Sequence, residues 1–328
     1  MNFPLNTYFL AAVAAFTISA FSLPFWRHWC ARAGLVDDPG HRKLHLTTVP
    51  LAGGLAVATG IIAPLAFGLL GLSFRLLDVV TVEKISHGFE RRKLELCAIL
   101  GGAVGMLAVG VWDDWKELKP SVKFTGQFII ALLVAAGGAR ITLFVDSVVF
   151  SYAVTILWIL TVTNAFNFMD NMNGLCAGLG VIAALFFGLT AAWAGQYLVA
   201  LTAWLILGAL AGFLPYNYPK ASSFLGDGGS QLVGYLMAVL AILPHFYTAR
   251  HPRFFAVFTP LLILGMVLGD LVWVVLWRWS HGKPFYLGDN NHFSHRLTRR
   301  GFSQARAVFI IWLLAAVTGS LGFWLNCF

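Results

Sequence analysis

The stretch "NAFNFMDNMNGLCAG", residues 164–178, places several amide and carboxylate side chains between two long apolar runs, 151–168 and 174–194. Burying such groups without hydrogen bonds is costly, so they are expected to face water, a ligand or one another. The flanking runs are long enough to be membrane helices. This stretch therefore predicts the end of one span, a tight turn and the start of the next, arranged around a wet cleft.

The composition is that of a membrane protein. The chain has 328 residues, of which 59% are hydrophobic and 11% charged, against about 25% charged residues in a soluble domain. The alternating pattern of a membrane barrel is absent, and backbone groups in lipid must pair within each segment, so helices are expected. We predict a single all-α domain over 1–328 in the inner or plasma membrane, with about ten spans of about 20 residues. The predicted spans are 5–26, 51–72, 94–112, 122–138, 151–168, 174–194, 197–214, 230–248, 254–277 and 306–326.

The basic residues predict the orientation in the membrane. About fourteen of the 22 Lys and Arg residues fall inside if the N-terminus is outside, which favours both termini outside. The first run lacks the basic leader and cleavage site of a removed signal and is interpreted as a span. The net charge of +8 comes with no nucleic-acid motif. With this orientation the polar segments all lie on the cytoplasmic face and predict one site: "DDPGHRKLH", "VWDDWKELKP", "NAFNFMDNMNG", "FLGDGGS" and "GDNNHFSHRLTRRG".

Paired carboxylates end the third predicted span. Asp113 and Asp114 repel each other unless a cation or a proton relieves them. Lys119 and Lys123 follow, four residues apart, so on a helix they share a face that could meet a phosphate group. The alternative is a solvated helix end at the membrane interface.

Glycines surround Asp227 just before the eighth predicted span. Glycine lets the backbone approach a ligand closely, and a helix N-terminus favours an anion. The carboxylate could supply an oxygen ligand to Mg2+, which prefers one or two carboxylates plus substrate phosphates. The alternative is a helix cap in which Asp or Ser satisfies the first turn.

Two further segments carry cations and imidazoles. Lys43 and His45 precede the glycine-rich start of the second span and suit diphosphate recognition, with a positive-inside anchor as the alternative. His292, His295 and Arg296 suit a loop that binds phosphate or sugar, with surface arginines as the alternative. Zinc is not favoured there because no third ligand stands at the required spacing. Asp270, in the ninth span, has no motif around it and is left outside the predicted site.

Together these motifs resemble the polyprenyl-phosphate N-acetylhexosamine-1-phosphate transferases over nearly the whole chain. The matching positions are the "RK.H" segment, the paired aspartates, the "N..N..D" pattern and the aspartate of "GD.GS". The resemblance implies Mg2+, or alternatively Mn2+, held by Asn167 and Asp227. It implies catalytic roles for Asp113, Asp114 and Asp170. The substrate-binding residues that it implies are Lys43, His45, Lys123, Asn164, Asn173, His292, His295 and Arg296.

The chain departs from the family pattern at three positions. Asn171 replaces a glycine, Asn173 replaces an aspartate, and Ser294 stands in place of the middle histidine of "H.HH". Because Asn173 carries no carboxylate, an acidic role at that position is not available. The longer histidine signature of the phospho-MurNAc-pentapeptide branch is absent, which favours an N-acetylglucosamine-type donor.

The resemblance implies transfer of N-acetylhexosamine-1-phosphate from a UDP-sugar to undecaprenyl phosphate, with release of UMP. Its expected partners are UDP-N-acetylhexosamine, polyprenyl phosphate and membrane lipids, without nucleic acid, and a homodimer is left open. Within the enzyme class, the alternatives are another N-acetylhexosamine donor or phospho-MurNAc-pentapeptide. Outside that class they are a transporter of an anionic lipid or sugar phosphate, and an inactive scaffold. A transporter would place polar residues near the middle of the membrane, whereas here they cluster toward one face.

Overall fold

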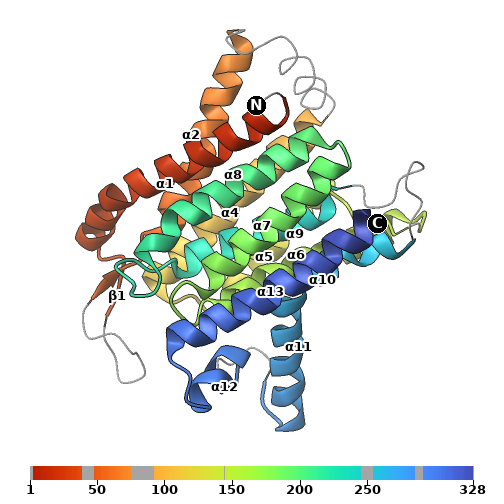
Figure 1. Ribbon diagram of the computed structural model, residues 1–328. Helices are drawn as coiled ribbons and strands as arrows, with labels where there is room; N and C mark the ends of the chain where they lie inside the picture. Colours follow the sequence, from red (N-terminus) through yellow and green to blue (C-terminus); the bar gives the residue numbers. More distant parts are fainter. Residues whose placement is uncertain are drawn as a thin grey trace.

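The computed structural model describes residues 3–38, 48–74, 92–143, 145–244, 254–284 and 291–327. Lys43 and His45 lie outside these ranges. Apart from one short antiparallel pair of strands, β1 and β2, the described chain is built of helices (Figure 1). In chain order the elements are α1 (Leu5–Ala33), β1 (Val36–Asp37), β2 (Val49–Pro50), α2 (Gly53–Ser73), α4 (Lys93–Lys116), α5 (Pro120–Ala136), α6 (Val148–Met169), α7 (Leu175–Trp193), α8 (Tyr197–Phe213), η1 (Leu214–Tyr216), α9 (Gly226–Ile242), η2 (Phe254–Phe258), α10 (Thr259–Ile263), α11 (Gly265–Ser280), α12 (Phe293–Arg299) and α13 (Gln304–Cys327).

Seven of the described helices are long and apolar enough to cross a membrane: α1, α2, α4, α6, α7, α8 with η1, and α13. The chain is therefore an all-α polytopic membrane protein. The α5 and α9 helices have 17 residues each and are shorter. The ten-span count and the exterior termini stay predictions.

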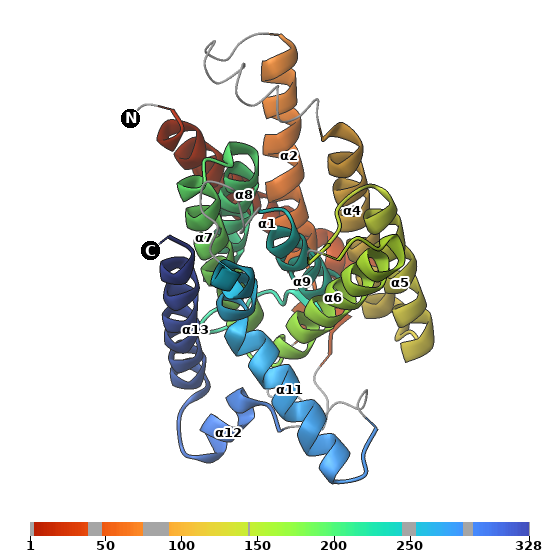
Figure 2. The same cartoon turned by 90° about the vertical axis from the view of Figure 1, so that its right-hand side faces the viewer.

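The ninth predicted span, 254–277, is not one continuous helix. The chain bends by 70° between Ala256–Ile263 and Gly265–Ser280. Leu264, at the break, has φ −91° and ψ 10°, which lie outside the helical region. The periodicity of an apolar run does not reveal such a break, so the sequence predicted a single span. The bend directs α11 away from the bundle, with α12 beside it (Figure 2).

The α9 helix lies in the middle of the bundle, where it packs against α2, α4, α6 and α7. Nearly all of its residues are buried, and both views show it surrounded by other helices (Figures 1 and 2). Close approach to α4 requires glycine, since a Cβ on Gly110 would lie against the carbonyl oxygen of Asp227. This contact places the start of α9 beside the end of α4, where the paired aspartates lie.

Candidate functional site

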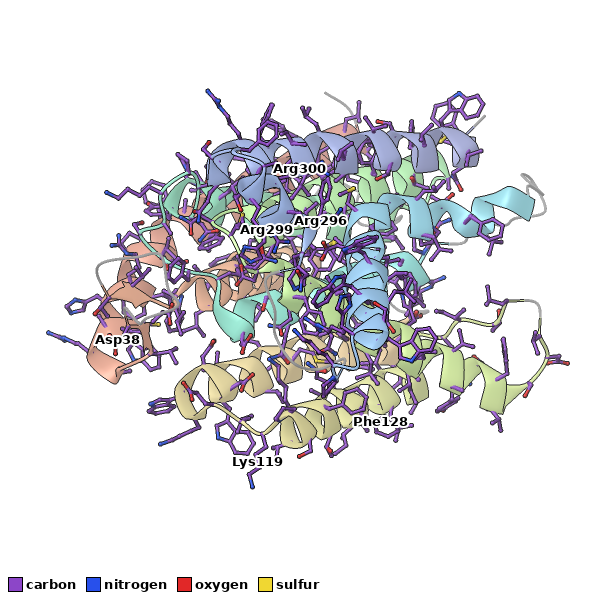
Figure 3. The ribbon with its side chains drawn as sticks, turned by 90° about the horizontal axis from the view of Figure 1, so that it is seen from below. Asp38, Lys119, Phe128, Arg296, Arg299 and Arg300 are labelled. Atoms are coloured by element: carbon purple, nitrogen blue, oxygen red, sulfur yellow. The ribbon has the colours of Figure 1, made fainter. Side chains whose placement is uncertain are left out.

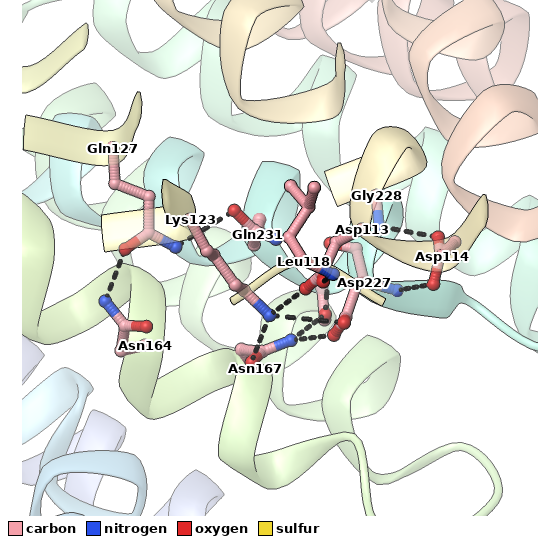
Figure 4. A network of polar contacts seen from close by, with 11 residues as sticks. Asp113, Asp114, Leu118, Lys123, Gln127, Asn164, Asn167, Asp227, Gly228 and Gln231 are labelled. Carbon is pink, nitrogen blue, oxygen red and sulfur yellow. Dashed lines mark hydrogen bonds and ion pairs between the residues drawn. The ribbon is translucent and has the colours of Figure 1, made fainter. Parts of the chain in front are cut away.

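A lysine ammonium stands at the centre of the candidate site. Lys123 Nζ, on α5, lies 2.6 Å from Asp113 Oδ2 on α4 and 3.2 Å from Asp227 Oδ2 on α9. It also donates to Asn167 Oδ1 on α6 at 3.3 Å. The Asn167 amide nitrogen donates to Asp227 Oδ1 and, at 2.8 Å, to Ser230 Oγ (Figure 4). Four helices thus contribute one side chain each to a single charged cluster, which we call the lysine centre: Asp113, Lys123, Asn167 and Asp227.

Asp114 has a different environment from its neighbour Asp113. Its carboxylate accepts hydrogen bonds from the backbone N–H groups of Asp227, at 2.7 Å, and Gly228, at 2.9 Å (Figure 4). These are first-turn N–H groups of α9, which have no partner within the helix. Asp114 therefore caps α9 from another helix. The cap explains why α9 begins at Gly226 and not at the predicted residue 230, so Asp227 lies within the first turn. Gly226 has φ +74°, and a Cβ there would press on the Asp114 carboxylate.

A chain of amides lies one helical turn from the lysine centre, deeper in the bundle. Gln127 donates to Gln231 Oε1 at 2.9 Å and accepts from Asn164 at 2.8 Å (Figure 4). Both glutamines are fully buried. Asn164, predicted to bind substrate, directs its amide into this chain and to the Leu160 carbonyl. The sequence analysis missed both glutamines, although each stands four residues after a member of the lysine centre and so on the same helix face.

The 170–174 turn joins α6 to α7 and comes shortly after Asn167, the member of the lysine centre on α6. Gly174 at its end has φ +78°, and its N–H donates to Asn217 Oδ1 at 2.6 Å. Asn173, predicted to contact the sugar, is partly exposed and donates to the Pro219 carbonyl at 3.4 Å. Burial raises the pKa of the Asp170 carboxyl to about 8, and the nearby carboxylates of Asp227 and Asp114 add to the rise. Asp170 therefore holds a proton near neutral pH when no cation is bound.

This raised pKa predicts a pH-dependent stability that Asp170→Asn should remove. An unfolded Asp has a pKa near 3.9, so between about pH 4 and 8 the folded chain keeps a proton that the unfolded chain has lost. Wild-type stability should therefore fall relative to the variant as pH rises through that window, and level off above it. The slope is at most about 1.4 kcal/mol per pH unit. Melting temperatures in EDTA from pH 5.5 to 8.5 measure the gap, and a gap that stays constant contradicts the assignment.

The C-terminal histidine segment is held between α11 and the 170–174 turn. His292 precedes α12, and its Nδ1 lies 2.6 Å from Asp270 Oδ2 on α11. Ser294 Oγ donates to Asn171 Oδ1 at 2.7 Å, so two positions that depart from the family pattern contact each other. The Arg296 guanidinium lies over the Trp273 ring at 4.4 Å, and Figure 3 marks it on α12 with Arg299 and Arg300. Of the predicted residues, His292, His295 and Arg296 thus share one short segment. Asp270, which the sequence analysis left outside the site, contacts it directly.

The donor set of the lysine centre suits a small hard cation. Mg2+ prefers oxygen ligands and often uses only one or two carboxylates together with substrate phosphates. Asp113, Asp227 and Asn167 direct three oxygens toward one positive charge, the Lys123 ammonium. Within the residues that the structure describes, no group of three or more His, Cys, Asp or Glu side chains is placed to hold a metal ion. The centre therefore fits a cation that shares its coordination with a phosphate-bearing substrate.

The fold and the site define a polytopic membrane protein with a polar centre of carboxylates, amides and one lysine at the ends of its helices. Residues 96–245 match glycosyl transferase family 4. The decaprenyl-phosphate N-acetylglucosaminephosphotransferase of Mycobacterium tuberculosis is 32% identical over 96% of this chain and 81% of its own length. A probable undecaprenyl-phosphate N-acetylglucosaminyl 1-phosphate transferase of Bacillus subtilis is 29% identical over 96% and 87%. The undecaprenyl-phosphate alpha-N-acetylglucosaminyl 1-phosphate transferase of Escherichia coli K12 is 25% identical over 94% and 82%. The chain belongs to glycosyl transferase family 4.

Proposed function

We propose that this enzyme transfers N-acetylglucosamine-1-phosphate from UDP-N-acetylglucosamine to a polyprenyl phosphate such as undecaprenyl phosphate. The reaction takes place at the cytoplasmic face of the inner or plasma membrane. The observation that carries the proposal is the lysine centre, in which one ammonium and two carboxylates could bind a cation together with phosphate groups. It lies in a chain that matches relatives named for this transfer over 81–87% of their length. The bond that forms joins a lipid phosphate oxygen to the β-phosphorus of the donor. The bond that breaks joins the β-phosphorus to the oxygen that bridges it to the α-phosphate, and UMP leaves with that oxygen.

The residues of the site suit positioning and charge neutralisation, which dominate catalysis of phosphoryl transfer. Lys123 is fixed by Asp113 and Asp227, and its ammonium can meet phosphate oxygens at the moment when charge develops. A phosphate monoester has a second pKa near 6 and is already mostly a dianion at neutral pH. The attacking phosphate therefore needs no strong base. Asp113, bonded to Lys123 and to the Leu118 N–H, orients the lysine in this proposal.

Mg2+ belongs to the proposal and would be held by Asp227 and Asn167, with Asp113 beside them. When bound, it would neutralise the negative charge of the diphosphate. Asp114 would act indirectly, since both of its oxygens hold the backbone that carries Asp227. The residues of α12 would contact the sugar or the diphosphate from the other side of the 170–174 turn.

A panel of donors tests the proposal and separates it from the alternatives. The purified chain in lipid vesicles, with undecaprenyl phosphate and Mg2+, is given UDP-N-acetylglucosamine, UDP-N-acetylgalactosamine or UDP-MurNAc-pentapeptide. Release of UMP is measured together with the lipid-linked product. We expect release from UDP-N-acetylglucosamine to be at least about tenfold faster than from the others, and to cease in EDTA. The absence of UMP with every donor would refute the proposal.

A further inference from the structure

We propose that Asp270 is a positioning residue that holds the imidazole of His292 in one tautomer and one orientation. Asp270 Oδ2 lies 2.6 Å from His292 Nδ1, and Asp270 Oδ1 accepts a hydrogen bond of 2.6 Å from the Phe293 N–H. One carboxylate on α11 therefore holds both the side chain that precedes α12 and the first N–H group of that helix. The effect on turnover rests on the proposed function, whereas the effect on the imidazole does not.

The pair is buried, so water does not compete for these contacts. The side chains of His292 and Asp270 are 5% and 1% exposed. An ionised carboxylate only accepts hydrogen bonds, so the imidazole nitrogen that faces it must carry the proton. The proton therefore resides on Nδ1. The other ring nitrogen, Nε2, makes no hydrogen bond with any residue that the structure describes, and remains available to a ligand.

The rings of Phe168 and His295 lie near the imidazole of His292, with centroids 6.2 and 6.4 Å from its own, but neither bonds to a ring nitrogen. Ser294 Oγ donates to Asn171 Oδ1 at 2.7 Å, which attaches α12 to the 170–174 turn. The Arg296 guanidinium rests over Trp273 of α11. Neither contact involves an imidazole nitrogen of His292. Among the described residues, only Asp270 contacts a nitrogen of this ring and so selects which of the two is free.

Asp270→Asn is the sharpest variant because its effect on the ring can be derived. Asparagine has a single side-chain oxygen, and the Phe293 N–H needs it as an acceptor. The NH2 group then faces Nδ1 and can only donate, which moves the imidazole proton to Nε2. The variant keeps the size of the side chain and both contacts, so the fold should survive. Only the direction of one hydrogen bond is reversed.

Nitrogen-15 NMR of the histidine-labelled chain reads the tautomer without any substrate. The His292 signal is assigned by its loss in His292→Gln. We expect a protonated Nδ1 in the wild type, a protonated Nε2 in Asp270→Asn, and the wild-type pattern in Ser294→Ala. A wild-type imidazole protonated on Nε2, or a tautomer unchanged by Asp270→Asn, would overturn the proposal. The NMR measurement tests the tautomer of His292 even if no UDP-sugar proves to be a donor.

A double-mutant cycle with Asp270→Asn and His292→Gln measures how the contact between the two residues affects turnover. Asp270→Asn should lower kcat by about 10- to 100-fold, by analogy with the range seen when the partner that orients a metal-ligating histidine is changed. In the His292→Gln background the same change should cost less than about threefold, because Asp270 acts through the imidazole. Asp146→Asn, the same chemical change at an exposed position before α6, should stay within about threefold of the wild type. An equal cost of Asp270→Asn in both backgrounds would show a general structural role and refute the proposal.

Discussion

Asp227→Ala is expected to lower turnover by about a thousandfold or more while the protein stays folded. Of the carboxylates that the structure describes, only Asp227 contacts both Lys123 and Asn167, so its loss should remove a cation ligand and weaken the lysine centre. Removal of a single well-placed charge-stabilising group already costs about 10²–10³-fold in rate. The fold should persist because Asp114 caps α9 through the backbone of residue 227 and not through its side chain.

This variant is compared with the wild type in two assays, UMP release and thermal stability with and without Mg2+. Mg2+ should raise the melting temperature of the wild type and leave that of Asp227→Ala unchanged. Asp146→Ala makes the same chemical change at an exposed position before α6 and should behave as the wild type in both assays. Turnover within about tenfold of the wild type at saturating donor and lipid would remove Asp227 from the centre of the mechanism.

Lys123→Met should have the second largest effect, on both activity and stability. Methionine preserves the length and the apolar stem of the side chain but removes the positive charge that compensates Asp113 and Asp227. Removing one partner of a buried ion pair costs about 3–5 kcal/mol, because the remaining charge loses its compensation. A smaller loss of about 1–3 kcal/mol is expected here, because the side chains of Lys123 and Asp227 are 17% and 36% exposed. For a chain of 328 residues that corresponds to roughly 2–4 °C in melting temperature. Turnover should fall by about 10²-fold or more, since the phosphates lose their resident cation.

Lys119 provides the matched control for this variant. It lies four residues earlier, is exposed, and projects away from the helices at the rim of the protein (Figure 3). Lys119→Met should leave both the melting temperature and the rate nearly unchanged. Similar losses in the two lysine variants would indicate a general requirement for positive charge and would contradict a specific role for Lys123.

Much of the lysine centre could be predicted because its members lie in separate local patterns. Asp113, Asn167 and Asp227 each sit beside glycines, amides or other charges that stand out from an apolar chain. Alternation of the predicted spans assigned these segments to one face, and the structure brings the side chains within hydrogen-bonding distance. Hydrophobicity likewise predicted the helical membrane class, because long apolar runs leave few other structures possible.

The remaining features depend on contacts between segments that no local pattern reveals. Asp113 and Asp114 are identical in type and adjacent, yet successive helix residues point about 100° apart, so one meets a lysine and the other a backbone. Gln127 and Gln231 are single amides in apolar helices. Their role is seen only in the structure, where one donates a hydrogen bond to the other. Asp270 finds its partner 22 residues later, after the end of α11 and immediately before α12.

The glycine contact between α4 and α9 determines which half of the site can adapt to different donors. Where two backbones touch at Gly110 with no side chain between them, no rotamer change can widen the gap. The spacing of the two backbones that carry Asp113 and Asp227 is thus fixed by this contact. The 170–174 turn and α12 meet through side chains, such as Asn171 and Ser294, which can rearrange. Preferences among sugars would therefore evolve on that adaptable side, while the half that we propose receives the diphosphate would keep one backbone geometry for every donor.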